Sequence, residues 1–226
     1  MLQPNCSKIL DFKVLDNVNT TGTVKILGVL YNEAFRFKDF ISKKVQSCNY
    51  HLRNLYNIKE SLDTKTRILL VTNLILSKID FCNILLLGSS NEDLRPLRMI
   101  INKSLRFIYN LNYRDHVTPY YKKAHFLPIP ERIQFKAALI AFNTYYCQSP
   151  KYLSEEFTKF YPTVSMTLRE GCGRDRFMFK LTSDINSKLL ISKIILQWNA
   201  LPIEIRMVSS KALFKSRLKS FFFSKL

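Results

Sequence analysis

Residues 68–87 read ILLVTNLILSKIDFCNILLL, the most apolar stretch of a chain of 226 residues. Apolar side chains surround a helix drawn through this stretch almost completely, which is typical of a helix at the centre of a bundle. The stretch is long enough to cross a bilayer, but Lys78 and Asp80 lie inside it. Each would cost roughly 2.5–3.5 kcal/mol at the bilayer centre. The sequence therefore predicts a buried helix and no membrane segment.

The helix that contains this stretch is expected to run over residues 64–87, with Asp63 as its N-cap. A carboxylate such as Asp80 in apolar surroundings needs either a partner or a raised pKa. We expect it to form an ion pair within the bundle, with Arg53 or Arg106.

Helical spacing continues on both sides of the central stretch. Apolar residues from Phe37 to Leu55 fall within roughly 140° of arc at 100° per residue, which predicts an amphipathic helix that begins after Phe35 and ends near Lys59. The residues between 114 and 130 include three prolines and predict a structured connector with at most a short helix. Further helices are expected over residues 94–110, 131–147, 151–159, 186–198 and 210–223.

The amino-terminal region has a period of two instead. Phe12 and Val14, and then Val24 and Ile26, alternate with polar residues around a turn-rich link at 17–22, so we expect two strands there. Two strands alone are at best marginally stable, so they must pack on the helices or fray. Another short strand is predicted at 176–181. The expected fold class is mainly α: a helical bundle over 35–148, a small β-hairpin in 1–34, and a helical extension over 149–226.

Charge and cysteine content narrow the function classes. Lys and Arg number 35 and Asp and Glu 17, a formal net charge of +18, which favours a polyanionic partner, above all nucleic acid. A solvated basic surface with no dedicated ligand is the alternative. The cysteines are scattered, odd in number and without a Cys-x-x-Cys pair, so they favour neither a disulfide framework nor a zinc knuckle. We expect an intracellular protein, nuclear or cytoplasmic, in which Cys48, Cys82 and Cys147 act as small core residues.

Five short motifs occur in a fixed order along the chain. They are Leu27-Gly28-Val29, Ile79-Asp80-Phe81-Cys82-Asn83, Arg114-Asp115-His116-Val117-Thr118-Pro119, His125-Phe126-Leu127-Pro128 and Trp198-Asn199-Ala200-Leu201-Pro202. In this order and spacing they resemble the carboxyl-terminal part of the reverse transcriptase of non-LTR (LINE, jockey-type) retrotransposons. The resemblance covers nearly the whole chain.

The resemblance implies a parent RNA-directed DNA polymerase whose catalytic aspartates precede this region. A polymerase holds two divalent cations, Mg²⁺ in the parent enzyme, between such carboxylates, and this sequence has no adjacent Asp-Asp pair. We therefore expect a chain that begins just after the active site and has no polymerase activity and no cofactor of its own. The resemblance makes residues 1–34 a remnant of the palm and primer-grip strands, and residues 35–148 the thumb. Leu27, Gly28 and Val29 align with the hairpin that grips the primer; the alternative is a glycine in a bent strand.

The first predicted helix carries four candidate nucleic-acid contacts. Lys43 and Arg53 lie on its polar side. Lys44 and His51 fall inside the apolar arc, where a long basic side chain either extends to solvent or faces a groove lined for phosphate.

The third and last predicted helices carry basic stripes. In the third, Arg95, Arg98 and Arg106 share one stripe with Asn102, and guanidinium groups can hold phosphate bidentately. In the last, Lys211, Lys215 and Lys219 lie opposite Leu213, Phe214, Leu218 and Phe221. In both cases a solvated face is the alternative. Asp115, His116 and His125 match no zinc spacing, and the resemblance makes them structural.

Three functions follow from these patterns. The first is a thumb that holds the template–primer, in which case the partners are an RNA, DNA or RNA/DNA hybrid backbone and the missing palm and fingers portion. The second is a stand-alone basic module that binds nucleic-acid backbones. The third is an inert or protein-interaction helical domain derived from a transposable element.

Overall fold

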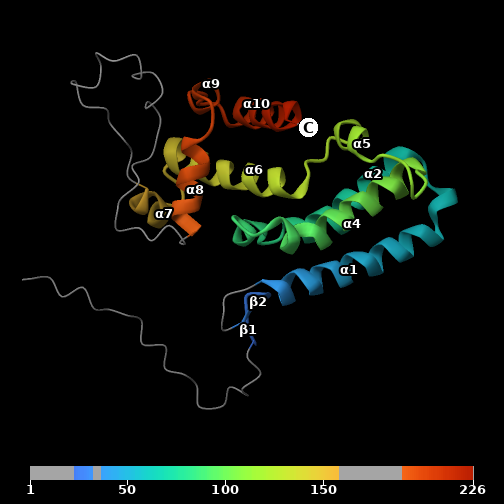
Figure 1. Ribbon diagram of the computed structural model, residues 1–226. Coiled ribbons are helices and arrows are strands. Elements are labelled where there is room, and N and C mark those ends of the chain that lie inside the picture. The colour runs from blue at the N-terminus through green and yellow to red at the C-terminus, as the bar shows by residue number, and fades with distance from the viewer. Residues whose placement is uncertain (1–22, 33–36, 158–189, 226) are drawn as a thin grey trace, which may run out of the picture. The chain divides into compact units, whose positions relative to one another are not determined.

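The computed structural model describes residues 23–32, 37–157 and 190–225 (Figure 1). Within these residues the chain is mainly helical and has one small two-stranded antiparallel hairpin, which confirms the predicted fold class. Contacts divide the chain into two units, Met1–Phe40 and Ile41–Leu226. The division into three parts at residues 34 and 148 stays a prediction.

The first unit contains the hairpin, with β1 (Thr23–Ile26) antiparallel to β2 (Val29–Asn32). Leu27 and Gly28 form the turn with φ of 48° and 85°. A two-residue loop with positive φ at both positions matches the twist of the flanking strands. The predicted strand at Val24 and Ile26 is thus present. In the described part of the chain it pairs with β2, which follows it in the sequence. The strand predicted at Phe12 and Val14, and the link at 17–22, lie outside the described residues.

Helix α1 (Lys38–Asn57) leads into the second unit, and Ile41, Cys48, Leu52 and Leu55 are buried on one side of it as its apolar spacing predicts. A 3-10 turn (Lys59–Ser61) follows. Cys48 is fully buried, whereas Cys82 is half-buried and Cys147 exposed, so the expectation that all three lie in the core was wrong for Cys147.

The central apolar stretch forms a helix that ends earlier than predicted. Helix α2 (Thr64–Val71) begins at the predicted cap, where the Asp63 carboxylate accepts the Thr66 N–H at 3.2 Å. A π-helical turn (Thr72–Leu76) and α3 (Ser77–Asp80) continue it. The helix stops at Asp80, because Cys82 adopts a left-handed conformation with φ of 49° and a 3-10 turn (Asn83–Leu86) follows. The predicted end at Leu87 was wrong.

Helix α4 (Asn91–Tyr109) packs on α2 and on α6 (Ile129–Phe142). It begins three residues before the predicted start, because the Ser90 hydroxyl accepts the Asp93 N–H at 3.1 Å and caps it. Pro96 therefore lies in the second turn instead of the first, where it leaves the Glu92 carbonyl without its helical donor. The helix ends at Tyr109, and its C-cap Asn110 is left-handed with φ of 55°.

The connector after α4 contains one short helix, α5 (Thr118–Lys123), as predicted. Helix α6 is followed by a π-helical turn (Asn143–Cys147) and α7 (Lys151–Glu156). The predicted end of α7 at 159 and the strand predicted at 176–181 lie outside the described residues.

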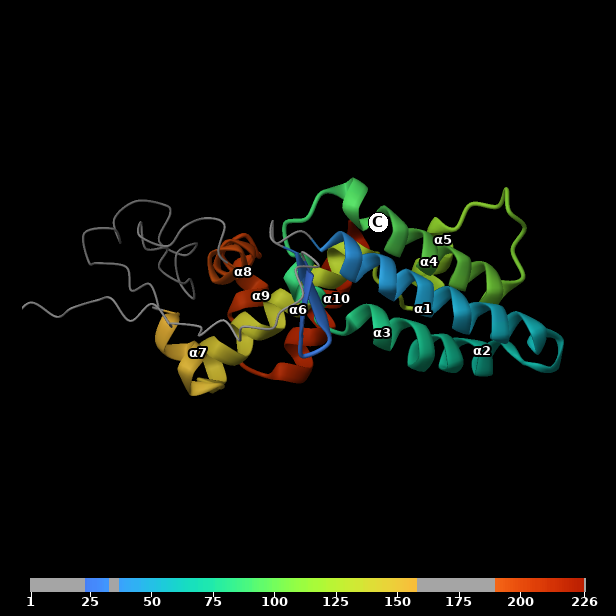
Figure 2. The ribbon, with the colours of Figure 1, turned by 90° about the horizontal axis from the view of Figure 1, so that it is seen from below.

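The carboxyl-terminal helices pack around α6, as Figures 1 and 2 both show. They are α8 (Leu190–Asn199), α9 (Ile203–Arg206), which was not predicted, and α10 (Lys211–Ser224). Trp198 is fully buried, with its ring centroid 5.9 Å from that of Tyr145 and 5.7 Å from that of Phe214. These aromatic side chains form the core around which α8 and α10 meet α6.

Among the helices of the described ranges, none combines the length and the apolar character that a bilayer crossing requires.

Candidate nucleic-acid interface

Helix α4 presents its basic stripe to solvent. Arg95 and Arg98 are exposed, Asn102 and Arg106 are half-buried, and the opposite side of the helix lies in the core. Arg95 lies 3.8 Å from Glu92, with side chains 63% and 81% exposed. A surface pair of this kind contributes at most about 1 kcal/mol and yields readily to another anion. Arg95 and Arg98 are therefore accessible to a polyanion.

A pocket of about 470 Å³ lies beside this stripe. Its helical lining is Arg98, Asn102 and Arg106, and Tyr121 of α5 lines it as well. The Tyr121 hydroxyl donates a hydrogen bond to Asn102 Oδ1 at 2.6 Å. Burial raises the pKa of Tyr121 well above its usual range, although the charges of Arg98 and Arg106 oppose this. The phenol therefore stays neutral. The rest of the lining comes from the connector: Tyr113, Arg114, Asp115, His116, Val117, Thr118 and Pro128.

Arg106 holds the connector in place. Its Nε donates to the Asn112 carbonyl at 3.2 Å, and its Nη2 donates to the carbonyls of Tyr113 at 3.0 Å and Asp115 at 3.2 Å. The Asp115 carboxylate in turn accepts the Asn112 N–H at 2.6 Å. Arg106 thus contributes positive charge to the pocket while its donors are used within the chain.

The structure places His116 on this pocket and His125 elsewhere. His116 is exposed and lines the pocket, whereas the ring of His125 lies 6.3 Å from that of Phe223 on α10. Among the described residues, no group of three or more His, Cys, Asp or Glu side chains is arranged to hold a metal ion.

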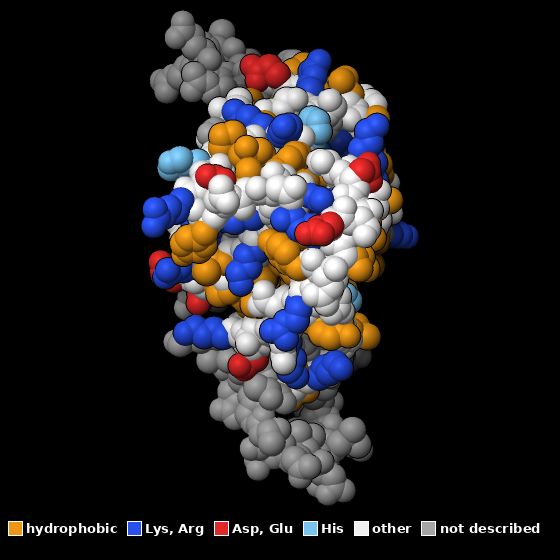
Figure 3. All heavy atoms as spheres, turned by 90° about the vertical axis from the view of Figure 1, so that its right-hand side faces the viewer, with side chains coloured by type: hydrophobic (Ala, Val, Ile, Leu, Met, Phe, Trp, Pro, Cys, Tyr) orange, Lys and Arg blue, Asp and Glu red, His pale blue; other side chains and the backbone are white. Residues whose placement is uncertain are grey.

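Basic side chains predominate on the side of the molecule where α5 and the connector before it lie. Figure 3 shows this side, with many Lys and Arg side chains, few Asp and Glu, and apolar side chains between them. Such an excess of one sign raises the local concentration of anionic partners.

On α1 the candidates separate into exposed and buried ones. Lys43 and Arg53 are exposed on the polar side, as predicted. His51 is half-buried, with its ring 5.5 Å from that of Tyr50.

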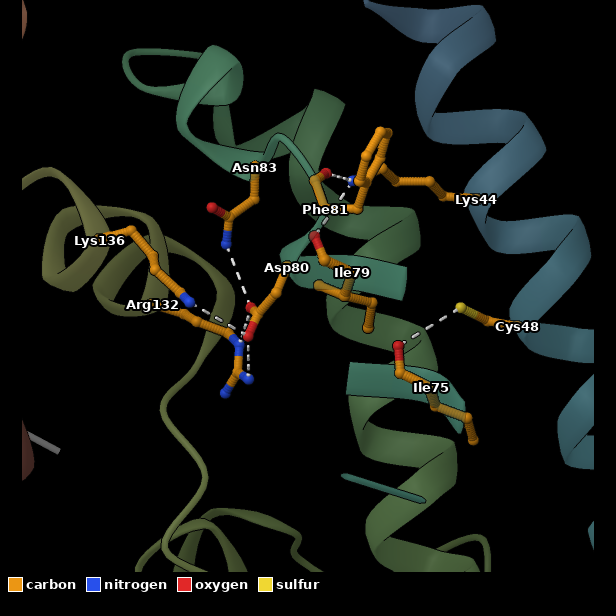
Figure 4. A network of polar contacts seen from close by, with 9 residues as sticks. All are labelled: Lys44, Cys48, Ile75, Ile79, Asp80, Phe81, Asn83, Arg132 and Lys136. Carbon is orange, nitrogen blue, oxygen red and sulfur yellow. Dashed lines mark hydrogen bonds and ion pairs between the residues drawn. The ribbon is translucent and has the colours of Figure 1, made fainter. Parts of the chain in front are cut away.

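Lys44 neither extends to solvent nor faces a groove, so both interpretations of this residue were wrong. Its side chain is buried, and its Nζ donates to the carbonyl of Ile79 at 3.1 Å and to that of Phe81 (Figure 4). Burial lowers the pKa of Lys44 to about 8, although the nearby groups of Cys82, Cys48 and Asp80 oppose this. Lys44 therefore joins α1 to the end of α3 and is not available to a ligand.

Asp80 forms an ion pair within the second unit, but not with the residues that we expected (Figure 4). Arg132 of α6 donates to it twice, from Nε to Oδ1 at 2.5 Å and from Nη2 to Oδ2 at 2.7 Å. Lys136 lies 3.7 Å away, and the Asn83 amide donates to Oδ1 at 3.3 Å. The expected pairing with Arg53 or Arg106 was wrong. Arg53 is exposed on the polar side of α1, and Arg106 binds the connector.

On α10, Lys211 and Lys215 are exposed and Lys219 is half-buried. Burial, together with the charge of Arg132, lowers the pKa of Lys219. The core face of this helix differs from the predicted one, because Leu213 is 46% exposed and Phe221 half-buried. Its buried residues are Phe214, Leu218 and Phe222.

The Leu27-Gly28-Val29 motif is the tip of the hairpin. Leu27 is 93% exposed, Gly28 is exposed and Val29 is buried. Leu27 and Gly28 thus form the turn and Val29 begins β2, so the glycine does not lie within a bent strand.

Sequence reasoning missed Tyr113, Arg114 and Tyr121 as site residues. The signal that points to them is the left-handed C-cap at Asn110, after which the chain returns along α4. Asn at the end of a helical pattern indicates such a reversal.

The chain was compared with protein-family models, with curated proteins and with solved structures, and none of these matches it. The resemblance to non-LTR reverse transcriptases therefore rests on the five motifs.

Proposed function

We propose that this chain is a thumb-like helical module, akin to the part of a non-LTR retrotransposon reverse transcriptase beyond its polymerase active site. It binds the backbone of RNA, DNA or an RNA/DNA hybrid and does not incorporate nucleotides. The observation that carries the proposal is the solvent-facing stripe of Arg95 and Arg98 on α4, next to a pocket lined by further arginines.

The spacing of the two exposed arginines suits a backbone contact. Arg95 and Arg98 are three residues apart, about 4.5 Å along the axis at 1.5 Å per residue. One strand of B-form DNA presents one phosphate per 3.4 Å along its axis, so the two side chains can reach neighbouring phosphates. Guanidinium groups spaced along such a line can bind successive phosphates, which fixes the position of a strand without reading its sequence.

Salt dependence tests this proposal. The affinity for a hybrid duplex should fall linearly on a log–log plot against salt, by roughly 0.7–0.9 per phosphate neutralised. The Arg95→Ala/Arg98→Ala variant should flatten that slope by roughly 1.4–1.8.

A variant matched in charge gives the control. Lys65→Ala/Lys103→Ala removes two exposed charges from α2 and from another side of α4, and it should flatten the slope by less than about 0.5. No binding to RNA, DNA or hybrid at low salt, or an equal effect of the two variants, would contradict the proposal. Nucleotide incorporation on a primed template would contradict its second half.

The second candidate is a protein-interaction domain, favoured by the apolar surface of the hairpin. Val24 is 50%, Ile26 51% and Leu27 93% exposed. Exposed apolar side chains on a two-stranded sheet favour pairing with another chain, such as the palm portion of a polymerase. Self-association or partner binding that Ile26→Lys abolishes, together with absent nucleic-acid binding, would favour this candidate.

A further inference from the structure

We infer that the pocket beside α4 binds the terminal nucleotide of a single strand, with its phosphate monoester among the arginines and its unpaired base stacked on Tyr113. The inference rests on the proposed nucleic-acid binding and names the part of the strand that the site selects. The stripe follows the backbone, whereas the pocket recognises where the strand ends.

The charge of the pocket matches a phosphate monoester. Arg98, Arg106 and Arg114 line it together with one carboxylate, Asp115, and with His116. One oxygen of this carboxylate is occupied, because it accepts the Asn112 N–H at 2.6 Å. The three arginines and the one carboxylate together give a net charge of about +2. A monoester carries about −1.5 to −2 at neutral pH, more than a diester within a strand.

The donors of the pocket are held in a fixed arrangement. Tyr121 occupies Asn102 Oδ1, so the group that Asn102 can offer a ligand is its Nδ2 donor. Tyr121 is itself buried, which anchors this arrangement in the core. Arg98 and Arg114 are exposed and supply guanidinium donors that can bind phosphate oxygens in pairs.

The size of the pocket favours one nucleotide. Its volume of about 470 Å³ lies within the range of about 300–1,000 Å³ typical of small-molecule sites. A duplex backbone runs along a surface and does not need such a hollow, so the pocket adds a function that the stripe lacks.

Tyr113 has the position of a stacking platform. Its side chain is 89% exposed, and the guanidinium carbon of Arg106 lies 5.8 Å from its ring centroid. The same arginine donates hydrogen bonds to the backbone carbonyls of Asn112, Tyr113 and Asp115. The segment that carries the ring is therefore held against α4. Single-strand binding proteins stack unpaired bases on aromatic rings that lie next to basic side chains.

The binding of the terminal phosphate is tested with the full chain and three internally labelled single strands of twelve nucleotides. One carries a 5′-phosphate, one a 3′-phosphate and one neither. A phosphate at one of the two ends should tighten binding about tenfold. Arg114→Ala should abolish that gain and change the binding of hydroxyl-ended strands by less than about threefold. Lys103→Ala, outside the pocket, should change the binding of all strands alike and keep the gain. No gain at either end, or a gain that survives Arg114→Ala, overturns the inference.

A second comparison tests the stacking part. Tyr113→Ala should weaken binding of the single strand about tenfold and leave a blunt hybrid duplex unchanged, whereas Tyr113→Phe, which keeps the ring, should behave as the wild type. Equal losses for strand and duplex would contradict the stacking. Because Tyr113 and Arg114 are exposed, neither variant should unfold the chain, which circular dichroism checks.

Two outcomes separate this inference from the proposed function. Salt-dependent duplex binding without any preference for phosphorylated ends refutes the inference and keeps the proposed function. Adenosine monophosphate has no backbone for the stripe to follow, so its titration tests the pocket alone. Saturable binding that Arg114→Ala removes supports the inference, and no binding overturns it.

Discussion

The Asp80→Asn substitution tests how the second unit is held together. Asp80 accepts two hydrogen bonds from Arg132, at 2.5 and 2.7 Å, and lies 3.7 Å from Lys136. The side chains of Asp80 and Arg132 are 21% and 17% exposed. Asparagine keeps the shape and one acceptor, but it removes the charge and leaves two cations facing a neutral amide.

The expected loss follows from these contacts. Removing one partner of a fully buried ion pair costs about 3–5 kcal/mol, and a fully exposed pair contributes about 0–1 kcal/mol. With about a fifth of each side chain exposed, the loss should be about 2–3 kcal/mol. For a chain of this size that corresponds to a fall in Tm of about 4–12 °C, at about 2–4 °C per kcal/mol.

Urea denaturation followed by far-UV circular dichroism measures the change. Glu92→Gln provides the control, because it removes the charge from the exposed pair with Arg95 and should cost less than about 0.5 kcal/mol. A double-mutant cycle of Asp80→Asn with Arg132→Gln should give a coupling energy of about 1–2 kcal/mol. A loss no greater than that of Glu92→Gln, or a coupling near zero, would refute the view that this pair joins α3 to α6.

Three further predictions follow from other parts of the structure. Ser90→Ala removes the N-cap of α4 and should lower the free energy of unfolding by about 1 kcal/mol. Trp198→Ala empties the aromatic core between α6, α8 and α10 and should cost about 3–5 kcal/mol in urea denaturation; a cost below about 1 kcal/mol would contradict its full burial. Lys44 has a pKa of about 8 in the folded chain against 10.5 when unperturbed, so between these values the unfolded chain binds more protons and the stability contributed by this group rises with pH. The stability of the wild type relative to Lys44→Met should therefore increase from pH 8 to pH 10.5, and a flat or falling difference would contradict the burial of Lys44.

Local sequence signals predicted most of the helices. The arc from Phe37 to Leu55, the cap at Asp63 and the proline-rich connector each gave the observed element, because spacing and caps act within a few residues of the chain. Where the end of the central helix was wrong, a contact from a distant part of the chain is present. The central helix stops at Asp80, where Lys44 from another helix binds the carbonyls of Ile79 and Phe81.

Partners that are distant in sequence could not be predicted in the same way. Arg132 is 52 residues from Asp80 and lies beside it because α6 packs against the 3-10 turn after α3. The stripe on α4 was predicted, since it depends on one helix. The pocket was not, since it requires the chain to reverse at Asn110 and bring Arg114 back to Arg98. Helix propensity does not indicate which residues of the connector will lie beside α4 after this reversal.

The motifs that carry the family resemblance lie where the chain changes direction. Gly28 is in a hairpin turn, Cys82 ends a helix in a left-handed conformation, and His125 lies between α5 and α6 with φ of 55°. Thr118-Pro119 opens α5, and Pro202 precedes α9.

Because these positions constrain the backbone, the motifs bear on the fold more than on the ligand. The evidence for a ligand comes from Arg95 and Arg98, which belong to none of the motifs. The two lines of evidence are therefore independent, and a failure to bind nucleic acid would leave the proposed ancestry standing. Arg114 belongs to both, since it opens one motif and lines the pocket. Arg114→Ala tests whether this motif residue binds a ligand as well as shaping the connector. A change in strand-end binding at unchanged stability would assign Arg114 to ligand binding. A change in stability alone would assign it to the fold.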